Sequence, residues 1–522
     1  MDVVHKIGEI YELKEKIMII DVAVENLIQY AKSHLLLDEL DELYVRNRVL
    51  DMLKVDNYTQ YEIDEDAIDT LTCPDTVIAP LVSYALSQGV IKEGEEDYFA
   101  TALMGAVSLK PSEIVNMFED LHAHNPEKAF NFLHDYSIKN DYVKLTAINK
   151  NKHWEAKSTK GKLEITINLS KPEKSNKDTA KLVGQKASSY PACAICKENV
   201  GFAGHGTLRQ NLRYIPLELG GEEWFWQYSP YAYFNQHGIA INAEHTPMKV
   251  IPETVRKLLD FVDYAPHYFV GCNAALPIVG GSILTHDHFQ GGLKTLPMHK
   301  AKNLIRYKSA EYPYIDTHIV DWYNSVIRLS SSNKEMIIEY AGKIIETWKE
   351  YTDESVEVIA KDENGQHNAI TPLARKVDGK YIVELILRNN LTTEKYPDGV
   401  YHVHPEYQNI KSESIGLIEA MGMFILPGRL DRQLKEVQGY LMGVPFDEKK
   451  LADDMRIHAK MIKKLIKANG TACSKIEAEL AVKDEVNDVC EHILDNTAVF
   501  KKDEAGFIAF DKFLNACGIK KA

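Results

Sequence analysis

The sequence predicts an α+β fold, with helical segments at both ends of the chain and β-strands between them. Apolar residues recur at helical spacing from Ile7 to Ile17, from Ile114 to Leu121 and again after Asp431. In residues 163–169, polar and apolar side chains alternate with a period of two, which is typical of a half-buried strand. Two His-x-His elements suggest two related halves, at residues 286/288 and 402/404.

The composition is that of an ordinary globular protein. Of the 522 residues, 45% are hydrophobic and 26% are charged, which excludes disorder for most of the chain. The formal net charge is −15, and this acidic balance argues against general nucleic-acid binding. At about 150 residues per domain, the length predicts roughly two to four domains. These properties favour an enzyme that acts on small metabolites.

Nothing in the sequence indicates secretion or a membrane. No apolar stretch is long enough to span a bilayer, and the N-terminus has no signal-peptide core. The seven cysteines are an odd, sparse set rather than a disulfide framework. We therefore expect a cytoplasmic protein in a reducing compartment.

Changes of character along the chain divide it into four regions. Residues 1–140 are mainly helical, and residues 141–300 form a first half that contains a Cys-x-x-Cys and a His-Asp-His. Residues 301–430 form a second half with a His-Val-His, and residues 431–522 are again helical. Residues 171–190, rich in lysine and serine, predict a linker or loop.

Shorter elements are predicted inside these regions. Lys160 to Lys162 predict a hairpin turn before the strand at 163–169. Residues 239–242 and 381–387 predict strands. The stretch from Pro252 to Val262 predicts a helix, with proline in its first turn.

The strongest motif is GGSILTHDHFQGG, from Gly280 to Gly292. If its middle is a strand, the side chains alternate, so His286, His288 and Gln290 share one face. A neutral imidazole can attack phosphorus, and an amide can hold a non-bridging phosphate oxygen. Glycines on both sides let the backbone approach a bulky anionic ligand. The motif therefore favours phosphate chemistry over the alternative, a pair of structural histidines in a tight turn.

Cys193 and Cys196 form the one cysteine spacing that stands out. Two cysteines supply only half of a closed tetrahedral zinc site, and His245 and His286 are candidates for the other two ligands. The pair is also compatible with redox activity or with no function. No thioredoxin-like βαβ pattern surrounds it, which argues against the redox alternative.

Two further groups of residues are candidate sites. Arg209 and Arg213 place two guanidinium groups near an aromatic run, and arginine suits bidentate phosphate contacts. Ordinary surface arginines are an equal alternative. His402 and His404 follow a predicted turn, and on a strand they would share a face. They suggest a second metal site or substrate contacts, with a structural role as the slightly favoured alternative.

At these positions the chain resembles the class II galactose-1-phosphate uridylyltransferases. The resemblance covers nearly the whole chain and is densest from about residue 163 to residue 430. Long collinear stretches of this kind are far more specific than any single motif. The main ones are CAICKENVGFAG from Cys193, RQNLRYIPLEL from Arg209, WQYSPYAYFNQH from Trp226, FVGCNAALPIVGGSILTHDHFQGG from Phe269 and IGLIEAMGMFILPGRL from Ile415.

The resemblance implies a reaction, a fold and an assembly. The reaction would transfer a uridylyl group from UDP-glucose to galactose 1-phosphate, giving glucose 1-phosphate and UDP-galactose in the Leloir route of galactose use. The fold would have two related halves of antiparallel sheet of the histidine-triad type. A homodimer is also implied. The acidic charge and the lack of a long apolar stretch predict, separately, that neither nucleic acid nor a membrane is a partner.

The resemblance implies roles for particular residues as well. His288 would be the covalent nucleophile, and Gln290 would contact the phosphate. Asn273 looks like the asparagine that contacts the nucleotide phosphate, and Ser282 lies one position away from where a related serine normally stands. The positions that match a structural zinc site of the better-known class I relatives are Cys193, Cys196, His245 and His286.

The sequence departs from the usual class II pattern in ways that bear on substrate preference. Asn235-Gln236-His237-Gly238 stands where Asn-Glu-His-Cys is usual, so Gln236 and Gly238 are the changed positions. In Asn273-Ala274-Ala275, Ala275 replaces the aspartate of the usual Asn-Ala-Asp. Two other functions fit the motifs: nucleotide hydrolysis or phosphorolysis of the same superfamily, and nucleotide-sugar binding without catalysis. Uridylyl transfer differs from both because it needs a sugar phosphate acceptor.

Overall fold

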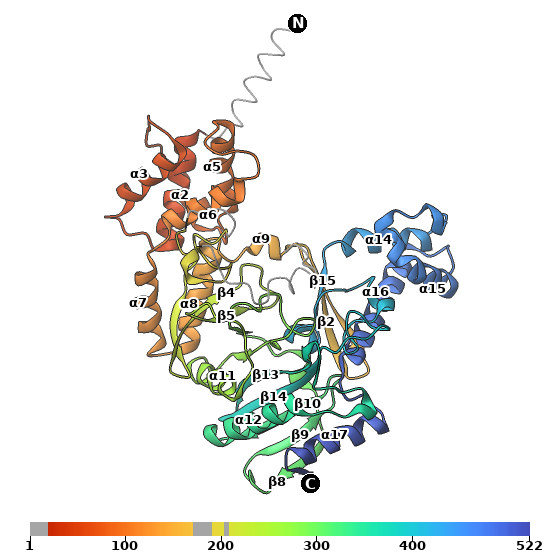
Figure 1. The fold of residues 1–522 in the computed structure, drawn as a ribbon. Coiled ribbons are helices and arrows are strands. Elements are labelled where there is room, and N and C mark those ends of the chain that lie inside the picture. Colours follow the sequence, from red (N-terminus) through yellow and green to blue (C-terminus); the bar gives the residue numbers. More distant parts are fainter. Residues whose placement is uncertain (1–18, 171–189, 203–207) are drawn as a thin grey trace. The chain divides into compact units, whose positions relative to one another are not determined.

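The computed structural model describes residues 19–170, 190–202 and 208–522 of the chain, whose path is drawn in Figure 1. The helical periodicity predicted from Ile7 to Ile17 lies outside these residues, and so does the predicted linker at 171–190 apart from Tyr190. The division into four regions stays a prediction. The described residues within Met1–Thr146, Ser188–Pro216 and Trp226–Tyr231 form one compact unit, and those within Ala147–Ala187, Leu217–Phe225 and Ala232–Ala522 form the other.

The first unit is mainly helical, as the periodicity predicts. The predicted helix around Ile114–Leu121 is α7, where Ile114 and Phe118 are buried one turn apart. Both α7 and α8 begin with proline, whose missing N–H costs nothing in a first turn. The helices are α2 (Ile20–Leu35), α3 (Glu42–Leu53), α4 (Glu65–Asp69), α5 (Asp75–Ser87), α6 (Glu96–Val107), α7 (Pro111–His122), α8 (Pro126–Lys139) and the first residues of α9 (Leu145–Ile148), which continues past the unit's end at Thr146.

An eleven-stranded sheet forms the centre of the fold, in the order β16-β8-β9-β10-β14-β13-β6-β7-β5-β4-β3. The order contains the same five-strand pattern twice, β3-β4-β5-β7-β6 and β8-β9-β10-β14-β13, joined by antiparallel pairing of β6 with β13. The strands are β3 (Ile215–Leu219), β4 (Glu222–Tyr228), β5 (Gly238–Asn242), β6 (Phe269–Gly271), β7 (His288–Gly292), β8 (Asn303–Ser309), β9 (Asp316–Val320), β10 (Val326–Ser331), β13 (Asn368–Val377), β14 (Lys380–Asn389) and β16 (Ile519–Lys521).

One helix follows the third strand of each half of this sheet. These are α11 (Pro252–Tyr264) and α12 (Lys334–Glu350), which pack against each other and against β13. The helix predicted from Pro252 is therefore confirmed, as are the strands predicted at 239–242 and 381–387. Repeated strand order with equivalent helices confirms the predicted α+β fold of two related halves.

A smaller three-stranded sheet contains the predicted hairpin. Strands β1 (Lys152–Ser158) and β2 (Gly161–Asn168) pair antiparallel, and β15 (Met423–Pro427) joins β2 in parallel. Gly161 has a φ of +122° at the turn, a conformation that favours glycine. A buried apolar cluster that includes Leu163 and Phe424 packs this sheet against the C-terminal helices.

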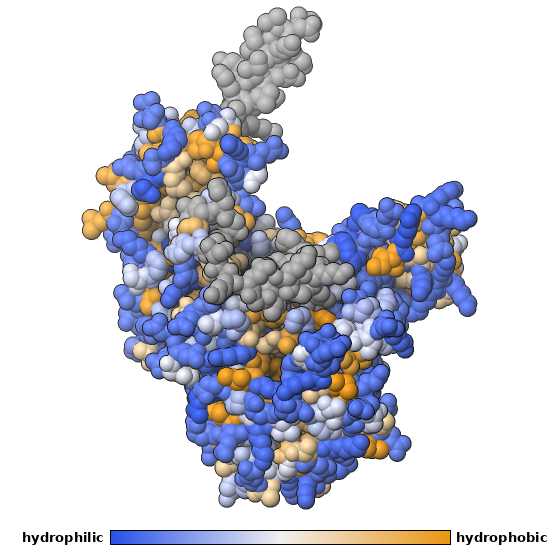
Figure 2. Space-filling model, viewed as in Figure 1, coloured by the Kyte–Doolittle hydropathy of each residue, from blue (hydrophilic) through white to orange (hydrophobic). Residues whose placement is uncertain are grey.

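The C-terminal region is helical, as predicted. Its helices are α14 (Leu430–Leu441), α15 (Ala459–Asn469), α16 (Lys475–Thr497) and α17 (Glu504–Ala516), and short elements before it are β11 (Lys361–Asp362), β12 (Gly365–Gln366) and α13 (Leu417–Ala420). None of the helices in the described part of the chain has the length and apolar character needed to cross a membrane. The face drawn in Figure 2 is largely hydrophilic, with apolar side chains in small groups.

Candidate active site and metal centre

Strand β7 carries the central residues of the strongest motif. It lies between β5 and β6, where Gln290 pairs with Ile239 on one side and with Gly271 on the other. His288 and Gln290 are two residues apart on this strand and therefore share one face. Phe289 faces the other way and stacks on Trp224, with ring centroids 4.5 Å apart. The strand begins at His288, so His286 is not part of it, contrary to the sequence prediction.

The glycines around the motif lie where the chain packs closely on itself, and their expected approach to an anionic ligand stays a prediction. A Cβ atom on Gly291 would lie 2.2 Å from the backbone oxygen of Phe269, and one on Gly280 would lie 2.3 Å from that of Ala274. Gly292 has a φ of +150°, and a Cβ there would lie 2.3 Å from the backbone oxygen of Gln236. At these positions glycine is needed because the chain packs closely on its own backbone.

Backbone carbonyls fix the rings of both histidines. His288 Nδ1 lies 2.8 Å from the oxygen of His286, and His286 Nε2 lies 2.8 Å from the oxygen of Asn242. A carbonyl only accepts hydrogen bonds, so each of these nitrogens carries its proton. A neutral His288 ring therefore has its lone pair on Nε2, and a neutral His286 ring has it on Nδ1. Both side chains are buried.

Asp287 lies between the two histidines and is itself buried. Burial raises the pKa of its carboxyl to about 6, although the positive charges of Lys257 and Lys249 act in the opposite direction. Its backbone N–H donates to Thr246 and its carbonyl accepts from Asn242. The residue before the nucleophile candidate is thus held by main-chain hydrogen bonds on both sides.

Asn273 follows β6 and is 3% exposed. Its Oδ1 accepts a hydrogen bond from the backbone N–H of Leu417 at 2.8 Å, at the start of α13. Its Nδ2 lies on the side of Gly281, where an added Cβ would come within 2.8 Å of it. The donor end of this amide is therefore oriented by the fold. Ser282 follows Gly281 in the same loop and is half-buried.

The two arginines singled out in the sequence lie in the first unit. Arg213 is buried and donates from Nε to the oxygen of Leu109 at 2.6 Å and from Nη1 to that of Leu212 at 2.8 Å. Burial lowers the pKa of its guanidinium. Arg209 donates from Nη1 to the hydroxyl of Tyr142 at 2.7 Å. Both make structural contacts, and their predicted contact with phosphate stays a prediction.

The cysteine pair forms a compact knuckle in the first unit. The two sulfur atoms of Cys193 and Cys196 are 3.5 Å apart. Asn199 is fully buried, and its Nδ2 donates to the backbone oxygens of Cys193 at 2.9 Å and Cys196 at 2.8 Å. The neighbouring Cys193 thiol, followed by burial, raises the pKa of Cys196. A cation would reverse this tendency by stabilising both thiolates.

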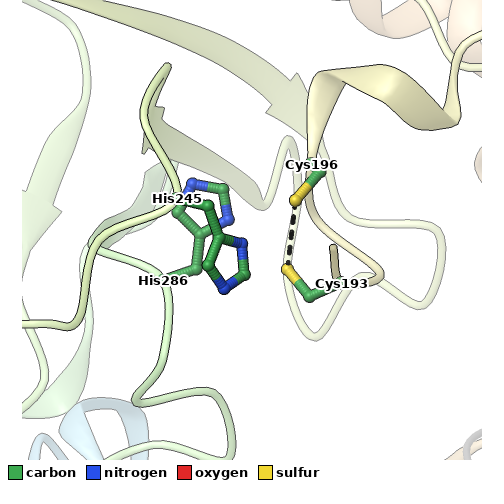
Figure 3. Close-up of side chains that lie close together, drawn as sticks. All are labelled: Cys193, Cys196, His245 and His286. Atoms are coloured by element: carbon green, nitrogen blue, oxygen red, sulfur yellow. Dashed lines mark hydrogen bonds between the residues drawn. The ribbon is translucent and has the colours of Figure 1, made fainter. Parts of the chain in front are cut away.

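The histidine pair lies in the second unit. The rings of His245 and His286 have their centroids 4.5 Å apart. Figure 3 draws them with the two cysteines, and the candidate ligand atoms of all four lie within 4.8 Å of one another. Two thiolates and two imidazoles are a donor set that suits tetrahedral Zn²⁺. The bond from His286 Nε2 to a backbone oxygen is the outer contact that metal-bound histidines usually make. These residues therefore fit a metal ion.

His402 and His404 do not form a second cluster of this kind. They lie in a loop rather than on a strand, which corrects the sequence prediction. His402 Nε2 lies 3.2 Å from the oxygen of Glu413, and His404 Nε2 lies 3.0 Å from that of Val400. In the described part of the chain, the one group of three or more potential metal ligands is that of Figure 3. The structural alternative for His402 and His404 is therefore favoured.

Two side chains that contact candidate site residues received no role from the sequence alone. Asn199, three residues after Cys196, donates to the backbone of both cysteines. His237, immediately before β5, contacts Gln290. The signals were an amide just after Cys-x-x-Cys and a histidine just before a strand, and neither spacing is specific by itself.

Comparisons with known proteins identify the family of the chain. The family model for the N-terminal domain of galactose-1-phosphate uridyl transferase matches residues 36–247, and that for the C-terminal domain matches residues 260–460. The chain is 41% identical to the galactose-1-phosphate uridylyltransferase of Caldanaerobacter subterraneus, over 95% of this chain and 98% of that protein. It is 40% identical to the protein of the same name in Fusobacterium nucleatum, with the same coverage of both chains.

Among solved structures, yeast Ap4A phosphorylase Apa2 aligns with 51% of this chain and 82% of its own, at 10% identity and a TM-score of 0.31. A likeness this weak carries no argument about function. The two family models together span most of the chain, and the named relatives are similar over nearly all of it. The chain therefore belongs to the galactose-1-phosphate uridylyltransferase family and is a nucleotidyltransferase.

Proposed function

We propose that this chain transfers a uridylyl group from UDP-glucose to galactose 1-phosphate through a covalent intermediate on His288. The observation that carries the proposal is the state of the His288 ring. Its Nδ1 is bound to a backbone oxygen at 2.8 Å, so the lone pair of the neutral ring lies on Nε2. Membership in the family supports the overall reaction.

The reaction would proceed in two steps. His288 Nε2 attacks the α-phosphorus of UDP-glucose, the bond from phosphorus to the bridging oxygen breaks, and glucose 1-phosphate leaves. A phosphate oxygen of galactose 1-phosphate then attacks the same phosphorus and displaces the imidazole, which gives UDP-galactose. The leaving group in the first step is already a stable phosphate, so a strong general acid is not required. Covalent storage lets one site accept two similar sugar phosphates in turn.

Amide donors would stabilise the negative charge on the phosphorus oxygens. Gln290 shares a strand face with His288, and Asn273 has its oxygen bound to Leu417, which leaves its Nδ2 as the donor end. Ser282 is a further proposed phosphate contact in the loop before β7. Arg209 and Arg213 are proposed from sequence for the same purpose.

We also propose that the metal is zinc and that its role is structural. Cys193, Cys196, His245 and His286 would hold it, and this donor set leaves no coordination position for substrate. Zinc would then stabilise the site without entering the reaction. Dimerisation and a cytoplasmic location stay predictions from the sequence.

Uridylyl labelling tests this function directly. UDP-glucose labelled in its uridylyl group should tag the wild-type chain, and digestion should place the tag on His288. His288→Ala should take no label, while His124→Ala, which changes an exposed histidine in the loop after α7, should label normally. Labelling of His288→Ala at the wild-type level would overturn the assignment.

A product assay separates the alternative functions. The transferase should convert UDP-glucose at an appreciable rate only when galactose 1-phosphate is added. Equal conversion without the acceptor would indicate a hydrolase, and conversion that needs inorganic phosphate would indicate a phosphorylase. Tight binding of UDP-glucose with no covalent label would indicate a non-catalytic binding protein.

A further inference from the structure

His237 lies immediately before β5 and contacts the proposed phosphate-binding amide. Its Nε2 is 3.3 Å from Oε1 of Gln290, and its Nδ1 accepts a hydrogen bond from the backbone N–H of Tyr233 at 3.3 Å. The side chain is 3% exposed. Because β5 pairs with β7, with Gly238 opposite Gly291, the main chain brings His237 to the edge of the strand that carries Gln290.

These two contacts determine the protonation of the ring. A backbone N–H can only donate, so Nδ1 of His237 must be the unprotonated nitrogen. The neutral ring then carries its proton on Nε2, which faces Gln290. His237 is therefore the donor and Oε1 of Gln290 is the acceptor. This assignment agrees with the orientation of the Gln290 amide, whose Oε1 faces His237.

We infer that His237 is a positioning residue, which holds the carbonyl end of Gln290 so that its NH₂ group is presented to the phosphate. The inference rests on the proposed function of Gln290. Without a donor at this point, the Gln290 amide can turn over and present its oxygen to the phosphate instead. An oxygen there would repel the charge that develops on the phosphorus oxygens in the transition state, where an amide donor stabilises it.

The ring of His237 is itself held firmly. It stacks on Tyr233, with centroids 5.1 Å apart, and packs against Phe234 at 4.6 Å. The backbone N–H of His237 donates to the oxygen of Phe234 at 3.1 Å. The preceding residue, Gln236, accepts a hydrogen bond from the hydroxyl of Tyr268. The turn that carries His237 is thus fixed on both sides, which is what a positioning residue requires.

Two substitutions at His237 distinguish the effect of losing the hydrogen-bond donor from the effect of changing the shape of the ring. His237→Phe keeps an aromatic ring between Tyr233 and Phe234 but removes both nitrogens. We expect kcat/KM for uridylyl transfer, and the rate of single-turnover labelling of His288, to fall about 10- to 100-fold. His237→Gln restores a donor of similar reach and should recover most of that loss.

A double-mutant cycle with Gln290→Ala shows whether His237 acts through Gln290. In the Gln290→Ala background, His237→Phe should change kcat/KM by less than about threefold, because its target is gone. A merely structural role would instead lower the rate by the same factor in both backgrounds. Full additivity of this kind would overturn the inference. The inference would also fail if the single variant His237→Phe kept the wild-type rate while the single variant Gln290→Ala lost activity.

Failure of the underlying function has a different signature. If Gln290→Ala itself turned over at the wild-type rate, the phosphate role of Gln290 would be wrong.

If His237→Phe does not fold, the matched pair His237→Gln and His237→Glu decides the question, because the first can donate to Oε1 and the second, as a carboxylate, cannot. The glutamine variant should be at least about tenfold faster, and equal rates would overturn the inference.

Discussion

The Nδ1 atom of His288 lies 2.8 Å from the backbone oxygen of His286. The residue that orients the proposed nucleophile is thus also a proposed metal ligand, and its own ring is bound to the oxygen of Asn242. The carbonyls of Asn242 and His286 thus set the protonation of the His286 and His288 rings in turn. A change at the proposed metal ligand His286 would act on the proposed nucleophile through the main chain that joins the two residues.

The metal site gives the first prediction. The wild-type chain should contain about one zinc ion per chain, and Cys193→Ser should lose it because three ligands rarely hold structural zinc. Metal analysis by mass spectrometry and thermal melting should both register the loss. Cys473→Ser is the matched control, since Cys473 lies outside the cluster. Equal zinc in wild type and Cys193→Ser would remove the cysteines from the site.

The knuckle amide gives a second prediction. Asn199→Ala removes two hydrogen bonds to the backbone of Cys193 and Cys196 while leaving the sulfur atoms in place. We expect zinc affinity to fall about 10- to 100-fold, as for other outer-shell substitutions. Competition with a chelator of known affinity measures it. An unchanged affinity would show that the knuckle is held by the metal alone.

Asn273 gives a third prediction. Asn273→Asp keeps an oxygen that accepts from Leu417 but replaces the donor end with a second, negatively charged oxygen. We expect a fall of about 100-fold in kcat/KM with little change in melting temperature. Asn364→Asp, in the exposed turn between β11 and β12, makes the same chemical change away from the site. A fully active Asn273→Asp would exclude Asn273 from phosphate contact.

The glycines of β7 give a fourth prediction, about stability. Gly291→Ala would place a Cβ 2.2 Å from the oxygen of Phe269, so the strands must separate, at a cost of about 2 kcal/mol or more. Gly105→Ala, in the last turn of α6, meets its nearest atom at 3.4 Å and gains helix propensity, so it should be neutral or stabilising by up to about 1 kcal/mol. Denaturant unfolding compares the two. Similar stability for both variants would contradict the close packing at β7.

Buried histidines predict a loss of stability in acid. Burial lowers the pKa of His458 from 6.5 to about 4, and Asn409 donates to its Nδ1 while its Nε2 lies 3.1 Å from Oε1 of Gln433. The unfolded chain therefore binds more protons than the folded one between these values. This contribution to stability is complete above pH 6.5 and falls as the pH drops toward 4, by at most about 3 kcal/mol.

His458→Gln should therefore flatten the decline of melting temperature between pH 6.5 and pH 4. His124→Gln changes an exposed histidine and should leave the decline as it is. Identical pH profiles for wild type and His458→Gln would show that His458 is protonated without penalty in the folded chain.

Local patterns predicted most of the elements because their causes are local. The period of two in 163–169 and the proline-led helix at Pro252 both appear as expected. The His-x-His pattern was less informative, because whether such a pair lies on a strand depends on backbone partners elsewhere in the chain. At 288 the partners are β5 and β6, and at 402 the chain forms a loop.

The candidate site shows the same limit. The four metal ligands follow from the resemblance together with residue chemistry, and they do come together. Arg213 has the right chemistry for phosphate, yet its guanidinium is bound to the backbone of Leu109 and Leu212. His237 was missed because its importance comes from the pairing of β5 with β7 and from the direction of one amide, which no spacing in the sequence encodes.

The repeated strand order of the large sheet has a consequence for turnover. β14 holds the place in the second half that β7 holds in the first, but it contains no histidine and follows β13 through the tight turn at Asp378–Gly379. In the proposed mechanism only the first half carries a covalent nucleophile, at His288 on β7. The chain would then store a single nucleotide at a time, and donor and acceptor would visit the same position in alternation.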